Sequence, residues 1–345
     1  MQKNRLIGKS FDDLKDIVSL LGMPAFTARQ IAEWLYKKRA SSFDQMTNIS
    51  LKNRTLLAEN YEIGLRPPVK VQESTDGTKK YLFQTADDNF IESVYIPEYD
   101  RATLCISAQV GCKMNCKFCM TGKQGFTAQL SVNEILNQIL SIPESEKLTN
   151  LVFMGMGEPF DNMDNLLKTI EILTADDCLA MSPHRITVST IGILDKIKIF
   201  IEKTNCHLAI SLHSPFAAER QQLMPVEKAF PMESILEELQ KHDFSHQRRL
   251  SFEYIMFQGL NDTPRHAAEL AKILNGLYYR VNLIRFHAIP EVDLHTSNEN
   301  TMLDFQNFLN KKGIICTIRR SRGEDIFAAC GMLSTKEKNK TVAEK

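Results

Sequence analysis

Apolar residues near the N-terminus recur at intervals of three and four, as they do along one face of an α-helix. Gly22-Met23-Pro24 interrupts this pattern, and a second helical pattern follows with Thr27 as its expected N-cap. We expect the lone tryptophan of the chain, Trp34, to lie in the core of this small helical region. A third short helix is predicted at 51–57. The residues of the first pattern are Phe11, Leu14, Ile17, Val18 and Leu21.

From residue 66 to residue 98 the pattern changes to short runs that are typical of β-strands. Pro67-Pro68 marks a linker at the start of this stretch, and turn sequences at 76–77 and 87–89 separate the strands. Strands joined by such short turns form a β-hairpin extension. The predicted strands are 69–72, 80–84 and 90–96.

From residue 103 onward, strand, loop and helix patterns alternate about six times. Ser131 to Glu134 form a capping box that begins the first of these helices. Repeated βα units predict an α/β fold in which helices cover a parallel sheet. This number of units favours a partial (β/α)6 barrel, and periodicity alone leaves a doubly wound sheet as the alternative. The predicted strands are 103–110, 151–154, 185–190, 207–212, 250–256 and 280–286, with one more at 315–319. The predicted helices are 131–142, 166–173, 193–201, 232–242, 264–274 and 302–309.

These patterns divide the chain into parts. A chain of 345 residues is long for one compact domain and suits a large domain with a small one. The expected parts are a small N-terminal helical domain at 1–65, a linker and β-hairpin at 66–98, the barrel at 99–335, and a basic, disordered tail at 336–345.

Composition is typical of a cytoplasmic globular protein, with 43% apolar and 24% charged residues. No apolar run approaches a membrane span and the N-terminus lacks a signal-peptide core, so no membrane association is expected. The formal net charge is +0, so no overall field attracts the molecule to nucleic acid. Any RNA binding must therefore use local basic groups. Those groups are Lys37-Lys38-Arg39, Lys79-Lys80, Arg248-Arg249, Arg319-Arg320 with Arg322, and the Lys-rich tail.

A short loop with three closely spaced cysteines is the first candidate for a functional site. Cys112, Cys116 and Cys119 stand in a C-x3-C-x2-C spacing that can turn three thiolates toward one point. Thiolates are soft ligands for iron or zinc. Three ligands would leave one iron of a 4Fe–4S cubane free to bind a small molecule. The alternative is a closed zinc or iron–sulfur site with Cys105 as a fourth ligand, because such sites use four ligands.

Other unusual residues fall at the ends of predicted strands. In βα barrels the carboxyl ends of the strands converge on the face that carries the chemistry. Gly157 lets the backbone approach a ligand closely, and Glu158 could help to hold an amino group. Singly, such residues are more often helix caps or turn residues, but they all fall at equivalent ends. The further residues in such positions are Ser189, Ser211, His213 and His287.

These motifs resemble those of a known family. The cysteine loop resembles the signature of radical S-adenosylmethionine (SAM) enzymes, and Gly157-Glu158-Pro159 resembles the motif that contacts the methionyl amine of SAM there. More narrowly, nearly the whole chain to about Leu333 resembles the RNA adenine-C2 methyltransferases, the RlmN-type radical SAM enzymes. The motifs that carry this resemblance are Cys105, the 112–119 loop, Gly157-Glu158-Pro159, Ser211-Leu212-His213, the 322–331 segment ending in Ala328-Ala329-Cys330-Gly331, and Trp34-Leu35-Tyr36-Lys37 near the N-terminus.

The resemblance implies cofactors and site residues. It implies one 4Fe–4S cluster held by Cys112, Cys116 and Cys119, and two molecules of SAM per turnover. Carbon 2 of adenine is electron-poor and does not attack the methyl group of SAM, so a radical route is needed. The SAM contacts that the resemblance implies are Gly157, Glu158, Ser189, Ser211, Leu212, His213 and His287.

The resemblance also implies an order of events. Cys330 takes a methyl group from one SAM, and a 5′-deoxyadenosyl radical from the second SAM activates that methyl group for addition to adenine. Glu92, which matches the family's base by position at the end of a predicted strand, then removes a proton. Cys105 attacks Cys330 to release the product and leaves a disulfide that must be reduced. Cys178, Cys206 and Cys316 are assigned to packing.

The partners implied are 23S rRNA, certain tRNAs with the target beside the anticodon, an external electron donor of flavodoxin or ferredoxin type, and a thiol reductant. A monomer is expected, with the N-terminal domain gripping folded RNA by shape and phosphate contacts. The sequence departs from the family at His287, where the family usually has Asn, and at Met332, where it more often has Gln.

Three other functions stay open at this point. A sister family methylates carbon 8 of the same adenine, although Arg322-Gly323-Glu324-Asp325-Ile326 is more similar to the carbon-2 branch. A non-enzymatic RNA-binding protein could use Cys105 and the loop cysteines as a structural metal site. A radical SAM reaction on a small molecule is the third, and the pair of Cys105 with Cys330 argues against it.

Overall fold

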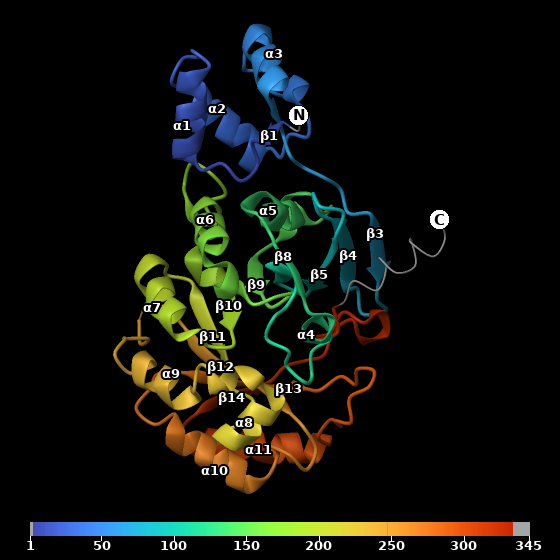
Figure 1. Ribbon diagram of the computed structural model, residues 1–345, viewed down its shortest axis with the longest axis vertical. Coiled ribbons are helices and arrows are strands. Elements are labelled where there is room, and N and C mark those ends of the chain that lie inside the picture. Colours follow the sequence, from blue (N-terminus) through green and yellow to red (C-terminus); the bar gives the residue numbers. More distant parts are fainter. Residues whose placement is uncertain (1–2, 247, 334–345) are drawn as a thin grey trace.

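The computed structural model describes residues 3–246 and 248–333, and Figure 1 shows their arrangement. The predicted basic tail at 336–345 lies outside these residues. Within the described residues, no helix has the length and apolar composition needed to span a bilayer.

The N-terminal region is helical, as predicted, and lies at one end of the molecule (Figure 1). Ser10 forms a capping box with Asp13 and so begins the first helix. Thr27 is not the N-cap of the second helix, because the cap is Phe26 and Thr27 is a buried first-turn residue. The elements of this region are α1 (Phe11–Leu20), α2 (Thr27–Ala32), a π-helical segment (Glu33–Lys37), α3 (Leu51–Asn60), and the parallel strands β1 (Asn4–Arg5) and β2 (Tyr61–Glu62).

Trp34 lies at the edge of the core rather than inside it. Its side chain is only half-buried, and its indole Nε1 donates a hydrogen bond to Asn48 Oδ1 at 2.6 Å. The ammonium group of Lys38 lies 4.2 Å from the ring centroid. The prediction that Trp34 is a core residue is therefore wrong in part: one edge packs on apolar side chains and the other faces polar groups.

The main sheet of the described residues has ten strands in the order β14-β13-β12-β11-β10-β9-β6-β5-β4-β3. The strands from β6 to β14 are parallel and follow one another in chain order, whereas a doubly wound sheet reverses its order at a switch point. The partial barrel is therefore confirmed. Its strands are β6 (Ala102–Cys105), β9 (Asn150–Phe153), β10 (Ile186–Thr190), β11 (His207–Ser211), β12 (Leu250–Met256), β13 (Arg280–Arg285) and β14 (Ile315–Ile318).

The predicted hairpin extension continues this sheet on one side. Its three strands pair antiparallel with one another, and β5 also pairs antiparallel with β6. The extension therefore joins the barrel directly through backbone hydrogen bonds. Its strands are β3 (Lys70–Glu73), β4 (Lys79–Gln84) and β5 (Phe90–Pro97).

Helices cover the outer side of the parallel strands, and Figure 1 shows α6, α7, α9, α10 and α11 in an arc around them. The apolar faces of these helices are buried against the sheet. The parallel strands are buried on both faces, as β12 is along its whole length. The helices of the barrel are α4 (Met120–Gln124), α5 (Val132–Leu140), α6 (Met163–Thr174), α7 (Leu194–Lys203), α8 (Ala217–Leu223), α9 (Met232–Leu239), α10 (Pro264–Ile273) and α11 (Glu299–Lys311).

The strand predicted at 103–110 is confirmed only as far as Cys105, because the chain leaves the main sheet after β6. Ser107 lies at the break, where its Oγ donates to the Glu92 carbonyl at 2.6 Å and its backbone N–H donates to Gln138 Oε1 at 2.9 Å. The chain then forms β7 (Gln109–Gly111), which pairs antiparallel with β8 (Phe126–Gln129) in a separate two-stranded sheet. This excursion carries the cysteine loop, which lies between β7 and α4, over the carboxyl ends of the barrel strands.

Candidate active site

The cysteine loop borders a cavity of about 160 Å³ at the carboxyl ends of the barrel strands. Cys112, Cys116 and Cys119 all line this cavity, which we call the cysteine cavity. The backbone N–H of Cys112 donates to Gly125 O at 3.1 Å, and that of Cys119 donates to Cys116 O at 3.2 Å. These bonds curl the loop so that the three thiols share one space.

The donor set of the cysteine cavity suits an iron–sulfur cluster. Burial is the main cause that raises the pKa of each thiol, to about 12 for Cys112 and well above the ordinary value for Cys116, and nearby thiols raise both further. The pKa of Cys119 is also raised by burial. Thiolates are the ligands that iron–sulfur clusters use. Three neighbouring thiols with raised pKa values need a positively charged centre to become thiolates, and a cluster would supply one.

The structure does not bring Cys105 together with the three loop cysteines, as a closed zinc or iron–sulfur site with four cysteine ligands would require. Cys105 lies at the end of β6 and lines a second, larger cavity instead of the cysteine cavity. Cys105 therefore does not close a tetrahedral site with the loop cysteines.

Gly157 and Glu158 lie on the wall of the cysteine cavity, after β9. Gly157 has φ +92°, and a Cβ there would lie 2.3 Å from the Cβ of Gln109, so only glycine fits. The buried Glu158 accepts hydrogen bonds from Thr190 Oγ1 at 2.6 Å and from the Ile191 N–H at 3.0 Å. Burial raises the pKa of Glu158 to about 7. The carboxylate thus joins the end of β9 to the end of β10 at the wall of the cysteine cavity.

Three further predicted residues line the cysteine cavity: Ser189, Ser211 and His213. His213 is buried, and its Nδ1 accepts a hydrogen bond from the Ile255 N–H at 3.0 Å. Burial lowers the pKa of His213 to about 3, so the ring is neutral. Its ring packs edge-on against Phe118 of the cysteine loop, with centroids 4.9 Å apart.

The structure does not bring two predicted residues into this cavity. Leu212 is fully buried in the main apolar core and does not line the cysteine cavity. His287 lines the larger cavity, where its Nε2 lies 3.2 Å from Ser321 Oγ. His287 lies two residues beyond the end of β13 at Arg285, and its side chain reaches the segment after β14.

Arg220 of α8 is a residue that the sequence analysis missed. Its side chain is fully buried and pairs with Glu227. It donates hydrogen bonds to the carbonyls of Ile191 at 2.9 Å, Ser211 at 3.0 Å and Leu212 at 3.1 Å. These carbonyls end β10 and β11, so Arg220 holds two walls of the cysteine cavity together. Arg220 could not be found from the sequence, because the apolar pattern does not predict the short helix α8 and a single arginine there gives no further signal.

Replacing Arg220 with methionine is expected to lower the free energy of unfolding by about 3–5 kcal/mol, because Glu227 and three strand-end carbonyls lose a buried partner. Chemical denaturation followed by circular dichroism measures this loss. The matched control is Arg265→Met on α10, where the arginine is exposed and rests on the Phe216 ring. Equal losses in the two variants would contradict the role assigned to Arg220.

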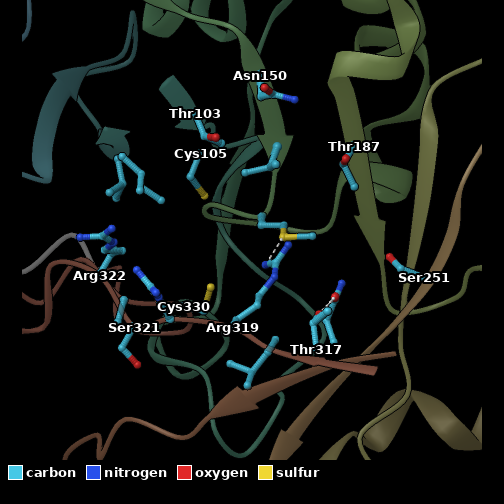
Figure 2. A pocket seen from close by; sticks show the side chains of 18 of the residues that line it. Thr103, Cys105, Asn150, Thr187, Ser251, Thr317, Arg319, Ser321, Arg322 and Cys330 are labelled. Atoms are coloured by element: carbon cyan, nitrogen blue, oxygen red, sulfur yellow. Dashed lines mark hydrogen bonds between the residues drawn. The ribbon is translucent and has the colours of Figure 1, made fainter. Parts of the chain in front are cut away.

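The second, larger cavity has a volume of about 540 Å³ and contains both Cys105 and Cys330. Figure 2 shows their sulfur atoms pointing into it from opposite sides. Burial is the main cause that raises the pKa of Cys105, to about 12, and the Arg319 guanidinium acts to lower the pKa of both thiols. All eight cysteines are free thiols, so the structure contains no disulfide between these two. Cys330 also lines the cysteine cavity and therefore stands where the two cavities meet.

The segment that carries Cys330 is tied down on two sides. On one side, the Gly323 N–H donates to Asp76 Oδ2 at 3.1 Å, and Ser74 Oγ donates to Asp325 Oδ1 at 2.6 Å. On the other side, the Met120 N–H donates to the Gly331 carbonyl at 2.7 Å, directly beside the cysteine loop. The β3–β4 turn and the cysteine loop together therefore set the position of Cys330.

Glu92 lies within β5 and not at a strand end, so its predicted position is wrong. It is buried, and Lys80 Nζ lies 3.1 Å from its Oε1. Glu92 shares its strand face with Val94 and Ile96, which line the larger cavity. Lys80 Nζ also donates to the Phe327 carbonyl at 3.4 Å, three positions before Cys330. A buried lysine, read from the sequence only as part of a basic pair, thus connects Glu92 to the Cys330 segment.

Arg319 is a further residue between the cavities, since it lines both. Its Nη1 lies 3.8 Å from Oε2 of the buried Glu253, which raises the pKa of Arg319. Glu253 in turn accepts a hydrogen bond from Asn282 Nδ2 at 2.7 Å. The guanidinium is therefore fixed beside both thiols, where it favours their thiolate forms.

Two family models match the chain. The model of the radical SAM superfamily matches residues 106–271. The model of the N-terminal domain of ribosomal RNA large subunit methyltransferases matches residues 4–63. Together they cover the helical region and most of the barrel.

Curated relatives and a solved structure match over nearly the full length. A probable dual-specificity RNA methyltransferase RlmN from Parabacteroides distasonis is 58% identical over 335 residues, covering 97% of this chain and 98% of the relative. The dual-specificity RNA methyltransferase RlmN of Syntrophus aciditrophicus is 42% identical over 97% of this chain and 98% of the relative. The crystal structure of a radical SAM methyltransferase from Sphaerobacter thermophilus superimposes with a TM-score of 0.91 at 35% identity, covering 96% of this chain and all of that one (100%).

Proposed function

The chain belongs to the RlmN family of radical SAM RNA methyltransferases, and we propose that it methylates carbon 2 of a specific adenosine in 23S rRNA and of the anticodon-adjacent adenosine in some tRNAs. A SAM-dependent RNA methyltransferase of this superfamily uses a 4Fe–4S cluster, SAM and an RNA substrate. The observation that best supports the finer proposal is the placement of Cys330, which faces Cys105 in the larger cavity (Figure 2) and lines the cysteine cavity together with the loop cysteines.

Cys112, Cys116 and Cys119 are the residues that would hold the cluster. Gly157, Glu158, Ser189, Ser211 and His213 would surround the SAM molecule beside it, with the Glu158 carboxylate facing the methionyl ammonium group. When bound, the cluster and this SAM supply a 5′-deoxyadenosyl radical that takes one hydrogen atom from a methyl group. Leu212 and His287 are not part of this wall, because Leu212 lies in the apolar core and His287 lines the larger cavity.

Cys330 is the proposed methyl carrier. Its thiolate attacks the methyl carbon of a first SAM, so an S–C bond forms on Cys330 and S-adenosylhomocysteine leaves. Arg319 favours this step because its charge stabilises the thiolate. After loss of one hydrogen atom, the carbon on Cys330 adds to carbon 2 of adenine and joins protein to RNA through a methylene bridge. Its position between the cavities lets one sulfur serve both steps.

Glu92 and Cys105 are proposed to release the product. Glu92 takes the proton from carbon 2, and the one electron that the adduct must also lose would return to the oxidised cluster, so that the aromatic ring is restored. The Cys105 thiolate then attacks the Cys330 sulfur, the S–CH2 bond breaks, and the carbon takes up a proton to become the methyl group. The resulting disulfide takes two electrons from an external thiol reductant before the next turnover. Two SAM molecules, an electron donor of flavodoxin or ferredoxin type and a monomeric enzyme complete the proposal.

Replacing Lys80 with methionine is expected to lower the rate of adenosine methylation about tenfold or more, because a mispositioned base loses much of its catalytic effect. SAM cleavage should fall less, so more 5′-deoxyadenosine forms per methylated adenosine. The matched control is Lys79→Met, since Lys79 pairs instead with Glu73 and Glu144. A Lys80 variant with wild-type coupling between cleavage and methylation would show that Lys80 does not position Glu92.

Mass spectrometry of nucleosides tests the proposed function. Ribosomal RNA and tRNA from cells with and without the gene are digested, and 2-methyladenosine is expected in both RNA classes only when the gene is present. The appearance of 8-methyladenosine instead would assign the chain to carbon-8 chemistry. The loss of neither nucleoside on deletion would reject both assignments.

A further inference from the structure

The larger cavity concentrates positive charge. The whole chain is balanced, with 42 basic and 42 acidic residues. In contrast, seven arginines line this cavity and Glu98 is its only acidic lining residue among the described part of the chain. Such a cavity attracts an anionic ligand. The arginines are Arg101, Arg249, Arg280, Arg285, Arg319, Arg320 and Arg322.

The cavity extends along the barrel, from Cys330 to the amino ends of the strands. Asn150 and Arg280 are the first residues of β9 and β13, and both line it. Figure 2 shows Asn150 well separated from Cys330 across this space. Arg249 and Arg280 are exposed to solvent, so the cavity reaches the surface at the amino ends. We call this opening the amino-end mouth.

Three of the arginines, Arg101, Arg249 and Arg280, gather at the amino-end mouth. Arg101 is paired with Glu98, whose Oε2 accepts from its Nε at 2.6 Å. Within residues 3–246 and 248–333, neither Arg249 nor Arg280 has a carboxylate at ion-pairing distance. The pKa of Arg249 is lowered, first by partial desolvation of its guanidinium against the cavity wall and then by the charges of Arg280 and Arg101. This repulsion is relieved when an anion binds between them.

Not every arginine near this mouth is available to a ligand. The neighbouring Arg248 is buried and donates from Nη2 to the Ile201 carbonyl at 3.0 Å, so it is structural. Arg249 differs, since its side chain extends over His207, whose Nε2 lies 3.4 Å from Arg249 Nη2. Of the predicted Arg248-Arg249 basic pair, only Arg249 therefore faces the cavity.

Flat rings accompany these arginines. His184 and His207 stack at the amino-end mouth, with centroids 5.6 Å apart and planes at 22°. His207 accepts a hydrogen bond at Nδ1 from the Arg249 N–H at 2.9 Å, and burial lowers its pKa to about 4, so its ring is uncharged. Tyr99 is fully exposed in the turn between Glu98 and Arg101. Guanidinium groups interleaved with flat rings are typical of surfaces that bind single-stranded nucleic acid.

We propose that Arg249 and Arg280, together with Arg101, form a binding site for backbone phosphates of the RNA strand that flanks the target adenosine. The cofactor residues occupy the carboxyl ends of the strands, so the strand that delivers adenine to Cys330 approaches through the larger cavity. The phosphates next to the unstacked base then lie toward the amino-end mouth. The inference rests on the proposed RNA substrate, but it is independent of which adenine carbon is methylated.

The test compares RNA binding by full-length variants. The double variant Arg249→Gln with Arg280→Gln removes both unpaired charges, and Lys198→Gln with Lys203→Gln removes two exposed charges from α7 as a matched control. Fluorescence anisotropy with a labelled tRNA that contains the target adenosine gives Kd at several salt concentrations. Loss of two phosphate contacts is expected to raise Kd about tenfold or more and to reduce the slope of log Kd against log salt by about 1–2. The control should change Kd less than about twofold.

A charge-preserving double variant distinguishes the loss of charge from a loss of folding. Arg249→Lys with Arg280→Lys keeps both charges, so its salt slope is expected to stay near that of the wild type while the glutamine variant differs. Equal salt slopes for the wild type and the glutamine variant would overturn the inference while leaving the proposed function intact. A lysine variant with the slope of the glutamine variant would also overturn it. A wild-type protein that binds neither tRNA nor an rRNA fragment would overturn both proposals.

Discussion

Replacing Cys105 with alanine is expected to leave the protein covalently joined to RNA through Cys330. Cys105 acts only after carbon–carbon bond formation, and it faces Cys330 from the opposite side of the larger cavity. No other cysteine among the described residues lines that cavity, so no thiol replaces it there. Denaturing gels should show nucleic acid that travels with most of the variant protein. Nuclease digestion followed by peptide mass spectrometry should locate the remaining nucleotide on the peptide that contains Cys330.

The matched variant for this experiment is Cys330→Ala. It retains the loop cysteines and Cys105 but has no methyl carrier, so no RNA adduct is expected although SAM is still cleaved. Glu92→Gln, which removes the proposed base, should also accumulate an adduct. RNA attached to the Cys330 variant would disprove the role of Cys330. The same holds for Cys105 if its alanine variant cleaves SAM yet carries no RNA.

Alanine at Cys112, Cys116 or Cys119 is expected to abolish iron binding and methylation. Each of these thiols lines the cysteine cavity, and a cluster held by only three protein ligands does not tolerate the loss of one. Anaerobically purified wild-type protein should be brown and contain about four irons per chain. Iron analysis and the visible absorption spectrum measure the loss in each variant.

Cys105→Ala and Cys178→Ala are the controls for iron binding. Cys105 lies in the larger cavity and Cys178 is buried in the core away from both cavities, so both variants should keep their iron. If Cys105→Ala loses iron as fully as the loop variants, the four-ligand metal site is correct and the release step assigned to Cys105 is wrong. Colourless wild-type protein with one zinc per chain would point to the same conclusion.

The parallel strands could be predicted from the sequence because each is a short apolar run bounded by turn residues. The strand at 250–256 matches β12 residue for residue, since it is buried on both faces and its signal is local. The strand predicted at 103–110 ends early, at Cys105, because the interactions that break it come from residues distant in the chain. Ser107 bonds to Glu92 and Gln138, and neither bond leaves a trace in a local pattern.

The residues of the candidate site also differ in whether the sequence alone could predict them. The loop cysteines are close in sequence, so their spacing alone predicts that they share a cavity. The juxtaposition of Cys105 with Cys330 came only from the family resemblance, because the two are brought together by the path of the whole barrel. Arg220 and Lys80 could not be predicted, since a buried charge is recognised only by its tertiary partners, here strand-end carbonyls and Glu92.

Transfer of a deuterium-labelled methyl group from SAM tests the central proposal most directly. The purified enzyme is given SAM with a CD3 group and its RNA substrate, and the digested nucleosides are analysed by mass spectrometry. If Cys330 carries the methyl group and loses one hydrogen atom before addition, 2-methyladenosine should contain two deuterium atoms and 5′-deoxyadenosine should contain one. Product that retains all three deuterium atoms, or that carries the methyl group on another atom of adenine, would contradict the account.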